Sequence, residues 1–379
     1  MSNGYLRSVE TLTDIYGLRV LVRTSLDVTI KDDVAPDHFR VRRAIPTIKY
    51  LLDKGARVIV LTHVGRNPKN STQSLLPLLQ KHIPINHVPG VVGEEVYGKI
   101  AHMKEGTALL LENIRSLPEE ENNDDIFAKT LASYADFYVN DAFAVSHRAH
   151  ASIVSVPKYL PSFAGMTFME EYTHLTTVLM PKSPSLFILG GAKFETKEPL
   201  ITEYANQYTN VFIGGAIAND FLKGHGHEVG ESLLSSFDMR KSPLLQKENI
   251  LLPIDVVVGG DEGKRETLLQ NVTPHDKILD VGPRTLEILA PYIAEAETIL
   301  WNGPLGNYEG GFDDATKAVA VMIAHSEAFS VVGGGDTITA IESLNLENSF
   351  GFLSTAGGAM LHFLEHHTLP GIEALQMKR

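Results

Sequence analysis

Short runs of apolar and β-branched residues recur along the whole chain, and longer segments with helical spacing separate them. The segment 40–55 is the clearest helix, because Val41, Ile48 and Leu51 fall on one face and Gly55 can end it. Strand and helix alternating in this way predict parallel sheets with helices on both faces. The runs that we predict to be strands are 18–23, 57–62, 108–111, 137–139, 186–189, 210–213, 254–258, 298–301 and 330–332.

Roughly ten strands exceed what a single sheet accommodates comfortably. The length of 379 residues also fits two domains better than one. We therefore predict an α/β fold with two doubly wound, mainly parallel-sheet (Rossmann-like) domains. We expect their join near residues 163–184, where 165–180 has the pattern of one helix.

The composition narrows the function classes. Apolar residues make up 44% of the chain and charged residues 21%, which is ordinary for a large core and excludes disordered or collagen-like proteins. The net charge of −13 opposes general binding to nucleic acid or to anionic membranes. The absence of cysteine excludes a thiolate nucleophile and fits a reducing cytoplasm. No apolar run approaches the ~18 residues of a membrane span, so we expect a soluble protein of the cytoplasm with neither nucleic-acid nor membrane partners.

Basic side chains follow the predicted strands of the first half, where parallel sheets bind ligands. Arginine can hold a carboxylate or a phosphate through two hydrogen bonds, so these residues predict a pocket for a small, multiply charged anion. The alternative is a set of ordinary surface side chains. Two histidines at 147 and 150 have metal-like spacing, but no further ligands are near them in sequence. We interpret the acidic run 119–121 as a solvated face. The basic residues at strand ends are Arg23, His63, Arg66, Arg115, His147, Arg148 and His150, and Arg40, at the start of the predicted helix, is added to this set.

Glycine-rich turns follow the predicted strands of the second half. Glycine between a strand and a helix lets backbone N–H groups approach phosphate oxygens at the positive end of the helix. Any one such turn can be purely structural, but five in succession predict a site for a nucleotide phosphate chain. The P-loop and dinucleotide-binding spacings are both absent. The five turns are at 190–193, 214–217, 302–306, 333–337 and 354–358.

Charged residues in these turns are candidates for the chemistry. Asp336 could hold Mg²⁺ or could cap the next helix. Lys193 and Lys197 are four residues apart and could reach a phosphate, although exposed lysine is the usual alternative. Glu309 is, taken alone, more typical of a solvated position. An anion pocket in one domain and a nucleotide site in the other predict phosphoryl transfer across a central cleft that closes to exclude water.

Several long stretches, in order along the chain, resemble the phosphoglycerate kinase family. The resemblance implies a phosphoglycerate-binding domain over 1–165, a linking helix over 166–183, a nucleotide-binding domain over 184–362, and a tail over 363–379 that returns to the first domain. It also implies a monomer that uses Mg²⁺ and transfers a phosphoryl group directly, in line, between ATP/ADP and 3-phosphoglycerate/1,3-bisphosphoglycerate after hinge closure. The stretches are 40–48, 61–66, 110–115, 138–152, 188–197, 279–285, 300–306, 331–337 and 369–375.

The same resemblance implies a role for each candidate residue. Arg40, Lys193, Gly334 and Gly357 would be catalytic, and Asp336 would bind the metal. The residues that would bind 3-phosphoglycerate are Arg23, Ser25, Asp27, Arg40, His63, Arg66, Arg115, His147, Arg148 and His150. Those that would bind the nucleotide are Gly191, Ala192, Lys193, Lys197, Gly214, Gly215, Asn302, Pro304, Glu309, Gly333, Gly334, Gly335, Asp336 and Thr337.

The chain departs from the family pattern at several places, two of them in the predicted 3-phosphoglycerate site. Ser25 and Asp27 stand where the family has aspartate and asparagine, so the carboxylate has moved along the strand end. Ala144, Ala216 and Ala356 stand where glycine is usual, and each adds a methyl group where a ligand could approach or a positive φ could be needed. These departures keep open a second reading, a weakened paralogue that binds nucleotide or phosphoglycerate without efficient turnover.

Overall fold

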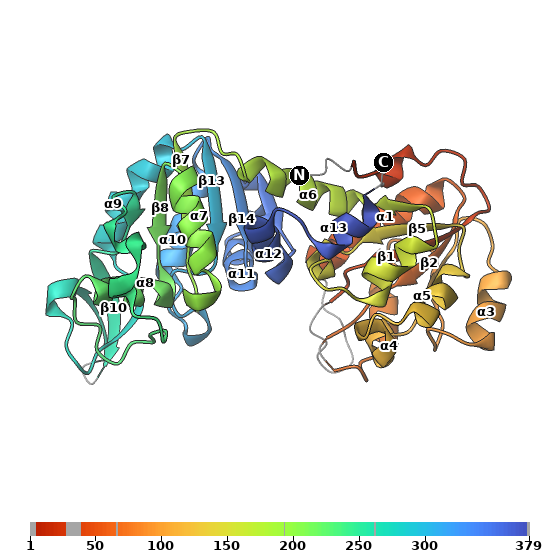
Figure 1. Cartoon of the computed structure of the whole chain (residues 1–379), viewed down its shortest axis with the longest axis horizontal. Helices are drawn as coiled ribbons and strands as arrows, with labels where there is room; N and C mark the ends of the chain where they lie inside the picture. Colours follow the sequence, from red (N-terminus) through yellow and green to blue (C-terminus); the bar gives the residue numbers. More distant parts are fainter. Residues whose placement is uncertain (1–4, 28–38, 66, 193, 261–262, 377–379) are drawn as a thin grey trace. The chain divides into compact units, whose positions relative to one another are not determined.

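The computed structural model describes residues 5–27, 39–65, 67–192, 194–260 and 263–376, without the side chains at 39, 40 and 260. The chain forms two compact units. The first contains the residues up to Thr173 together with those from His366 onward, and the second contains His174–Glu365 (Figure 1). The boundary between the units lies within helix α6, Met166–Val178.

The first unit is built on a six-stranded sheet in which every strand is parallel to its neighbours. Since all strands point the same way, their carboxyl ends lie along one edge. The strand order is β3 (Ile85–His87), β4 (Ala108–Leu110), β2 (Arg57–Leu61), β1 (Arg19–Thr24), β5 (Phe137–Asp141) and β6 (Ser162–Ala164). The helices of this unit are α1 (Phe39–Asp53), α2 (Leu76–Leu79), α3 (Glu94–Ala101), α4 (Pro118–Glu121), α5 (Asp125–Ala132) and α13 (Pro370–Leu375).

Helix α1 illustrates how the apolar pattern produces this packing. Val41, Ile48 and Leu51 are buried against the sheet, each removing enough apolar surface from water to contribute about 1.5–3 kcal/mol. Gly55 follows the helix with φ +76°, the left-handed conformation that commonly ends a helix. The helix predicted over 40–55 is therefore confirmed.

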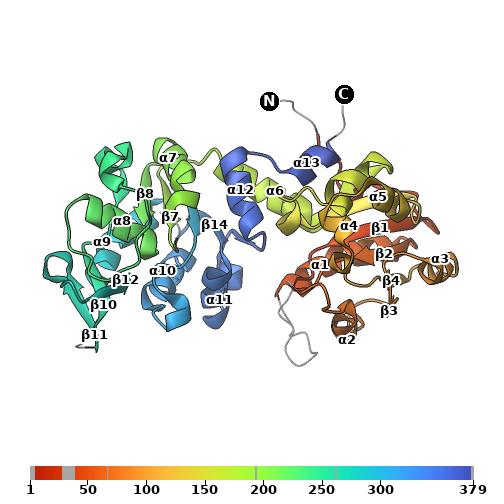
Figure 2. The ribbon, with the colours of Figure 1, turned by 60° about the horizontal axis from the view of Figure 1, so that its bottom comes forward.

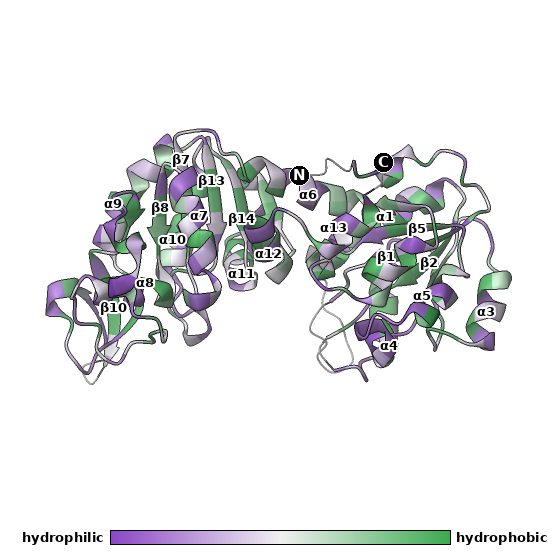
Figure 3. Ribbon diagram, viewed as in Figure 1, coloured by the Kyte–Doolittle hydropathy of each residue, from purple (hydrophilic) through white to green (hydrophobic). Residues whose placement is uncertain are grey.

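The second unit repeats this plan with its own six-stranded parallel sheet. Helices lie on both sides of the sheet (Figure 2), and the strands form its most apolar layer (Figure 3). The strand order is β15 (Phe352–Ser354), β14 (Phe329–Gly333), β13 (Thr298–Asn302), β7 (Ser185–Leu189), β8 (Asn210–Ile213) and β9 (Ile250–Leu251). The helices are α7 (Glu198–Gln207), α8 (Gly215–Gly224), α9 (Pro283–Glu295), α10 (Asp314–Ala324), α11 (Gly335–Ser343) and α12 (Gly358–His366).

The strand predicted over 254–258 is real, but its predicted place in a parallel sheet is wrong. As β10 (Asp255–Gly260) it pairs antiparallel with β11 (Gly263–Leu268) and β12 (Lys277–Val281) in a separate three-stranded sheet. Val256 and Val258 pack in a small core of their own with Leu222 and Val272. Strand β11 reads GKRETL and is largely exposed, so it carries no apolar pattern from which the sheet could be predicted.

No helix in the described part of the chain combines the length and the apolar character needed to cross a membrane.

Candidate functional site

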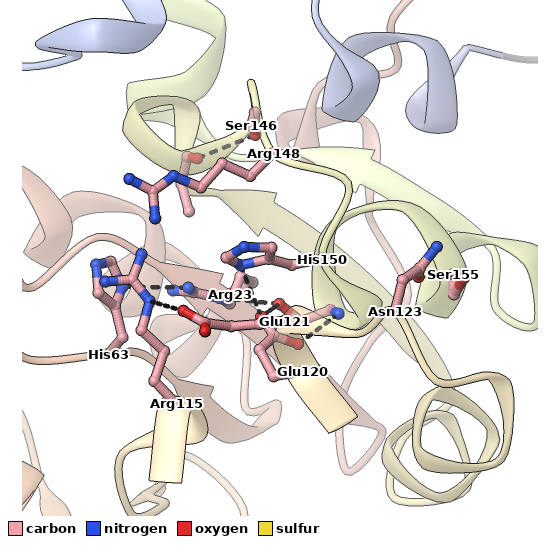
Figure 4. A network of polar contacts seen from close by, with 12 residues as sticks. Arg23, His63, Arg115, Glu120, Glu121, Asn123, Ser146, Arg148, His150 and Ser155 are labelled. Atoms are coloured by element: carbon pink, nitrogen blue, oxygen red, sulfur yellow. Dashed lines mark hydrogen bonds and ion pairs between the residues drawn. The ribbon is translucent and has the colours of Figure 1, made fainter. Parts of the chain in front are cut away.

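Basic side chains of the first unit come together at the carboxyl edge of its sheet. Arg23 lies near the end of β1, His63 follows β2, and Arg115 lies in the turn Ile114–Ser116 after β4. Arg148 and His150 lie in the loop after β5. Figure 4 shows these five side chains facing one another, so the sequence correctly predicted that these residues, distant in sequence, gather at one edge.

Arg23 is completely buried, so it lies deeper than the pocket-lining position that we predicted for it at the strand end. Its Nε donates to Ser152 Oγ at 3.1 Å, its Nη1 donates to the Thr24 carbonyl at 2.6 Å, and its Nη2 lies 3.2 Å from His63 Nδ1. Burial lowers the pKa of this guanidinium, and the carboxylate of Glu120 counteracts the shift. The buried charge is thus retained by hydrogen bonds and by one acidic neighbour.

His63 is almost completely buried and lies beside Arg23. Burial lowers the pKa of His63 to about 4, and the nearby Arg23 and Arg115 add to that shift, so the imidazole is neutral at pH 7. Because Arg23 donates to Nδ1, the proton belongs on Nε2, which lies 3.5 Å from Asp27 Oδ2. The other oxygen of Asp27 accepts from the Gly65 N–H at 2.8 Å. Asp27 therefore orients His63 from the position to which the carboxylate has moved.

The remaining basic groups repel one another. Burial, together with the positive charges of Arg23, Arg115 and Arg148, lowers the pKa of His150 to about 4. Burial also lowers the pKa of Arg115, again with contributions from Arg23 and Arg148. Arg148 is exposed, and its Nε lies 3.4 Å from Nε2 of the adjacent His147. A bound anion would relieve this repulsion, which is the electrostatic signature of an anion site.

The sequence analysis missed the acidic member of this cluster. Glu120 is the middle residue of the run 119–121, which we interpreted as a solvated face, yet its side chain is completely buried. Glu119 and Glu121 on either side are exposed, and Glu121 lies 3.7 Å from Arg115. In this helical turn the side chains of Glu119 and Glu121 point to solvent and that of Glu120 points inward. The interpretation as a solvated face is therefore wrong for Glu120 alone. Only contacts with residues about 30 and 100 positions away distinguish it, as in the bond to Ser152.

Three predicted residues lie outside what the structure describes. These are Arg66 and Lys193 as a whole and the side chain of Arg40, whose backbone lies in α1. Ser25 is described, and its Oγ is buried with no hydrogen-bond partner within the described residues. A buried hydroxyl that lacks a partner is the kind of group that a polar ligand can satisfy.

The second unit holds a pocket of about 520 Å³ at the carboxyl edge of its sheet. It is large enough for a small organic ligand. Six of the residues that we predicted to bind the nucleotide line this pocket, namely Gly191, Ala192, Gly215, Pro304, Glu309 and Asp336. Residues from four of the five predicted turns therefore line one cavity, and the turn at 354–358 adds none.

Three helices begin at glycines beside this edge. Helices α8, α11 and α12 start at Gly215, Gly335 and Gly358, after strands β8, β14 and β15. Gly215 has φ +61°, and a Cβ on it would lie only 2.5 Å from the Gly191 nitrogen, so packing of backbone on backbone requires this glycine. At Gly335 a Cβ would meet nothing within 4 Å, which leaves room for a ligand at the helix start.

Other predicted residues surround these helix starts. Asn302 ends β13, and its Nδ2 lies 3.7 Å from Met360 Sδ. Gly333 ends β14, and Gly334 precedes α11 with φ +106°. Thr337 Oγ1 is buried without a hydrogen-bond partner in the described part of the chain. Gly214 and Gly357 precede α8 and α12 in the same way.

The three alanines that replace family glycines are less disruptive than expected. None of Ala144, Ala216 and Ala356 has a positive φ. The concern that they strain the backbone is therefore wrong. Ala216 lines the pocket, so its methyl group does face the space available to a ligand.

Lys197 lies beneath the glycine turn that precedes it. Its Nζ donates to the Gly190 carbonyl at 2.7 Å and lies 3.1 Å from where a Cβ on Gly191 would be. Burial lowers the pKa of Lys197 to about 8, and among the described residues no acidic side chain counteracts the shift. A negative ligand above the turn would supply the missing counter-charge.

Asp336 and Glu309 bring negative charge to the opposite part of the pocket lining. Burial and the nearby Glu309 raise the pKa of Asp336. A hard cation beside Asp336 would relieve both effects, so this carboxylate fits a Mg²⁺ ion whose other ligands come from phosphates. Within the described residues, no group of three or more histidine, cysteine or acidic side chains could hold a metal alone. A metal here would therefore bind together with its nucleotide.

Comparisons with known proteins agree with this arrangement of two sites. The sequence profile of the phosphoglycerate kinase family matches residues 9–367. The phosphoglycerate kinase of Dictyoglomus turgidum is 42% identical, over 96% of this chain and 97% of its own length. That of Pseudothermotoga lettingae is 40% identical, over 97% of this chain and 98% of its own.

Solved structures match over the whole chain as well. The phosphoglycerate kinase of Coxiella burnetii has a TM-score of 0.84 at 34% identity, over 98% of this chain and 99% of that one. That of Pyrococcus horikoshii has a TM-score of 0.85 at 29% identity, over 98% of both chains. With a basic pocket, a glycine-rich pocket and these relatives in agreement, the chain belongs to the phosphoglycerate kinase family.

Proposed function

We propose that this protein catalyses reversible phosphoryl transfer between ATP and the carboxylate of 3-phosphoglycerate, forming ADP and 1,3-bisphosphoglycerate. The observation that carries the proposal is that the carboxyl edges of the two sheets have different chemistry. At one edge, basic side chains gather around Arg115 and His150, where neighbouring arginines lower the pKa values of both, and at the other edge a glycine-lined pocket includes Asp336. Family membership agrees with this division.

The first unit would hold 3-phosphoglycerate. Arg115, Arg148 and His150 would supply hydrogen-bond donors for its phosphate and carboxylate. Arg40, Arg66 and His147 would complete the set. His63 would contribute its Nε2–H, which Asp27 orients, from a buried position. The unsatisfied Ser25 Oγ would serve the hydroxyl end of the substrate, in place of the carboxylate that the family has there.

The second unit would hold the nucleotide. The N–H groups at the starts of α8 and α11 would point at the phosphate chain, with Gly334 and Gly357 allowing close approach. Lys197 would neutralise phosphate charge from below the turn, while Lys193 would follow the transferring group. Asn302 and Thr337 would lie beside the phosphate chain, and Glu309 would accept hydrogen bonds from the ribose.

Asp336 would hold Mg²⁺, whose positive charge supports the phosphates when the nucleotide is bound. A carboxylate oxygen of 3-phosphoglycerate forms a bond to the γ-phosphorus while the bond from that phosphorus to the β–γ bridging oxygen breaks. The electron pair leaves with ADP. Arg40 and Lys193 would balance the charge on the transferring group, and a hinge motion that closes the two units would exclude water. We propose that a monomer performs this reaction in the cytoplasm.

A coupled assay tests the proposal. We expect the purified protein to drive NADH oxidation when supplied with ATP, Mg²⁺, 3-phosphoglycerate and glyceraldehyde-phosphate dehydrogenase. Omission of either substrate should abolish the signal. Measurable ADP binding with no turnover would instead support a weakened paralogue. Backbone strain at the three alanines no longer argues for that alternative, because none of them has a positive φ.

A further inference from the structure

The mechanism proposed above leaves a buried carboxylate without a role. Glu120 is completely buried in the first unit, where it lies next to Ser152 and to His150 of the basic cluster. Burial raises its pKa, and the charge of Arg23 and two hydrogen bonds from Ser152 oppose the shift. Burying a carboxylate there costs free energy unless hydrogen bonds and a nearby positive charge compensate it.

Ser152 connects Glu120 to Arg23. Glu120 Oε2 accepts from the Ser152 N–H at 2.8 Å, and Oε1 accepts from its Oγ at 2.6 Å. The same Oγ accepts from Arg23 Nε at 3.1 Å. The Ser152 carbonyl accepts from the Tyr138 hydroxyl at 2.6 Å. Every hydrogen-bonding group of Ser152 is therefore used, and the direction of each bond is fixed.

The chain of contacts continues to the mouth of the pocket. Arg23 Nη2 lies 3.2 Å from His63 Nδ1, and His63 Nε2 lies 3.5 Å from Asp27 Oδ2 (Figure 4 shows the part from Glu120 to His63). If the Arg23 guanidinium turned, the ring of His63 would lose the donor that fixes its tautomer. The orientation of the His63 ring thus depends on the Glu120 carboxylate, which is connected to it through Ser152 and Arg23.

Glu120 also fixes the second basic element. Ser152 lies in a π-helical turn, Ala151–Ser155, that directly follows Arg148 and His150. Such turns are rare and are often found at functional sites. The Nδ1 of His150 lies 3.8 Å from Glu120 Oε1. One buried carboxylate therefore holds both the strand-end arginine and the loop that carries two basic side chains.

We propose that Glu120 is a positioning residue for 3-phosphoglycerate, acting through Ser152 on Arg23 and on the loop that carries Arg148 and His150. This inference rests on the proposed function. It predicts that disturbing Glu120 weakens binding of the acceptor and leaves nucleotide binding in the other unit unchanged. A purely structural role would lower stability without separating the two substrates.

The principal variant is Glu120→Gln, which keeps the shape of the side chain but removes its charge and turns one acceptor into a donor. We expect the KM for 3-phosphoglycerate to rise about tenfold, because a buried hydrogen bond to a charged group is lost. The KM for ATP should change by less than about twofold. Ser152→Ala, which removes the connecting hydroxyl but keeps the carboxylate, should produce the same selective rise.

Two controls separate positioning from loosening of the turn. Glu119→Gln makes the same chemical change on an exposed neighbour and should leave both KM values unchanged. Ser155→Ala removes a second attachment of the same turn, the 2.7 Å bond to Asn123 Oδ1, without touching Arg23 (Figure 4). We expect Ser155→Ala to leave the KM for 3-phosphoglycerate near that of the wild type.

Binding of 3-phosphoglycerate by calorimetry on the same proteins keeps this test separate from that of the proposed function. Failure of the wild-type protein to turn over would contradict the proposed function but not the inference, which the calorimetric affinities test directly. Unchanged 3-phosphoglycerate affinity in both Glu120→Gln and Ser152→Ala would overturn the inference, as would an equal loss in Ser155→Ala. If Glu120→Gln does not fold, Ser152→Ala alone decides.

Discussion

Nucleotide binding should be accompanied by proton uptake at Lys197. In the free protein, burial lowers the pKa of this lysine to about 8, so about half of the molecules carry a neutral amine at pH 8. A phosphate chain above the turn would return the pKa towards about 10.5, the ordinary value of lysine. Binding at pH 8 should therefore take up about 0.5 proton at this site, against about 0.1 at pH 7 and about 0.9 at pH 9.

Calorimetric titrations with Mg²⁺-saturated ADP in buffers of different ionisation enthalpy measure this uptake. Lys197→Met removes the titrating group and should abolish the rise between pH 7 and pH 9. Lys182→Met removes an exposed lysine and should leave the uptake as in the wild type. The reasoning would be refuted by an uptake that does not change with pH, or by one that persists in Lys197→Met.

Three further changes test the two pockets. Gly215→Ala forces a Cβ towards the Gly191 nitrogen at φ +61°, so we expect a loss of about 1–3 kcal/mol in unfolding free energy and a higher KM for ATP, measured by denaturant titration and kinetics. Asp336→Asn should raise the Mg²⁺ concentration for half-maximal activity by about tenfold or more, and an unchanged Mg²⁺ titration would exclude it as a ligand. Asp27→Asn presents an amide to His63 and should raise the KM for 3-phosphoglycerate about tenfold at pH 7, whereas tighter binding would mean that the moved carboxylate is harmful.

The pH dependence of stability offers a separate check on Lys197. Its pKa is lower in the folded state than in the unfolded chain, so the unfolded state binds more protons between about pH 8 and 10.5. The contribution of this residue to stability therefore becomes more favourable as the pH rises through that window. Comparing wild-type and Lys197→Met unfolding at pH 7 and pH 10 should show the difference between the proteins changing in that direction.

The sequence predicted the two parallel sheets because their strands are buried on both faces. The apolar runs VLV of β1 and ILW of β13 are buried and are separated from other strands by helical segments. The antiparallel sheet was missed because β11 is exposed and charged. Short edge strands such as β3 and β9 were missed as well, since two or three residues carry no periodic signal.

The candidate site was predictable where its residues directly follow a strand in sequence. It was not predictable where a residue's position depends on contacts with residues distant in sequence. Asp336 and the glycine turns at 190–193, 214–217 and 302–306 are adjacent to strands that the pattern revealed, and residues of each line one pocket. Glu120 looked like its exposed neighbours, because its partner Ser152 is 32 residues away. The depth of Arg23 likewise depends on packing across the sheet, which no local pattern encodes.

The central claim is that one chain passes a phosphoryl group directly from nucleotide to acceptor. The most direct test uses ATP whose γ-phosphorus is made chiral with oxygen isotopes, with 3-phosphoglycerate as the acceptor and the configuration of the transferred group as the readout. Inversion of configuration is the predicted result, because a single in-line displacement inverts the phosphorus. Retention would require a phosphorylated protein intermediate and would contradict direct transfer, and no transfer at all would contradict the proposed function.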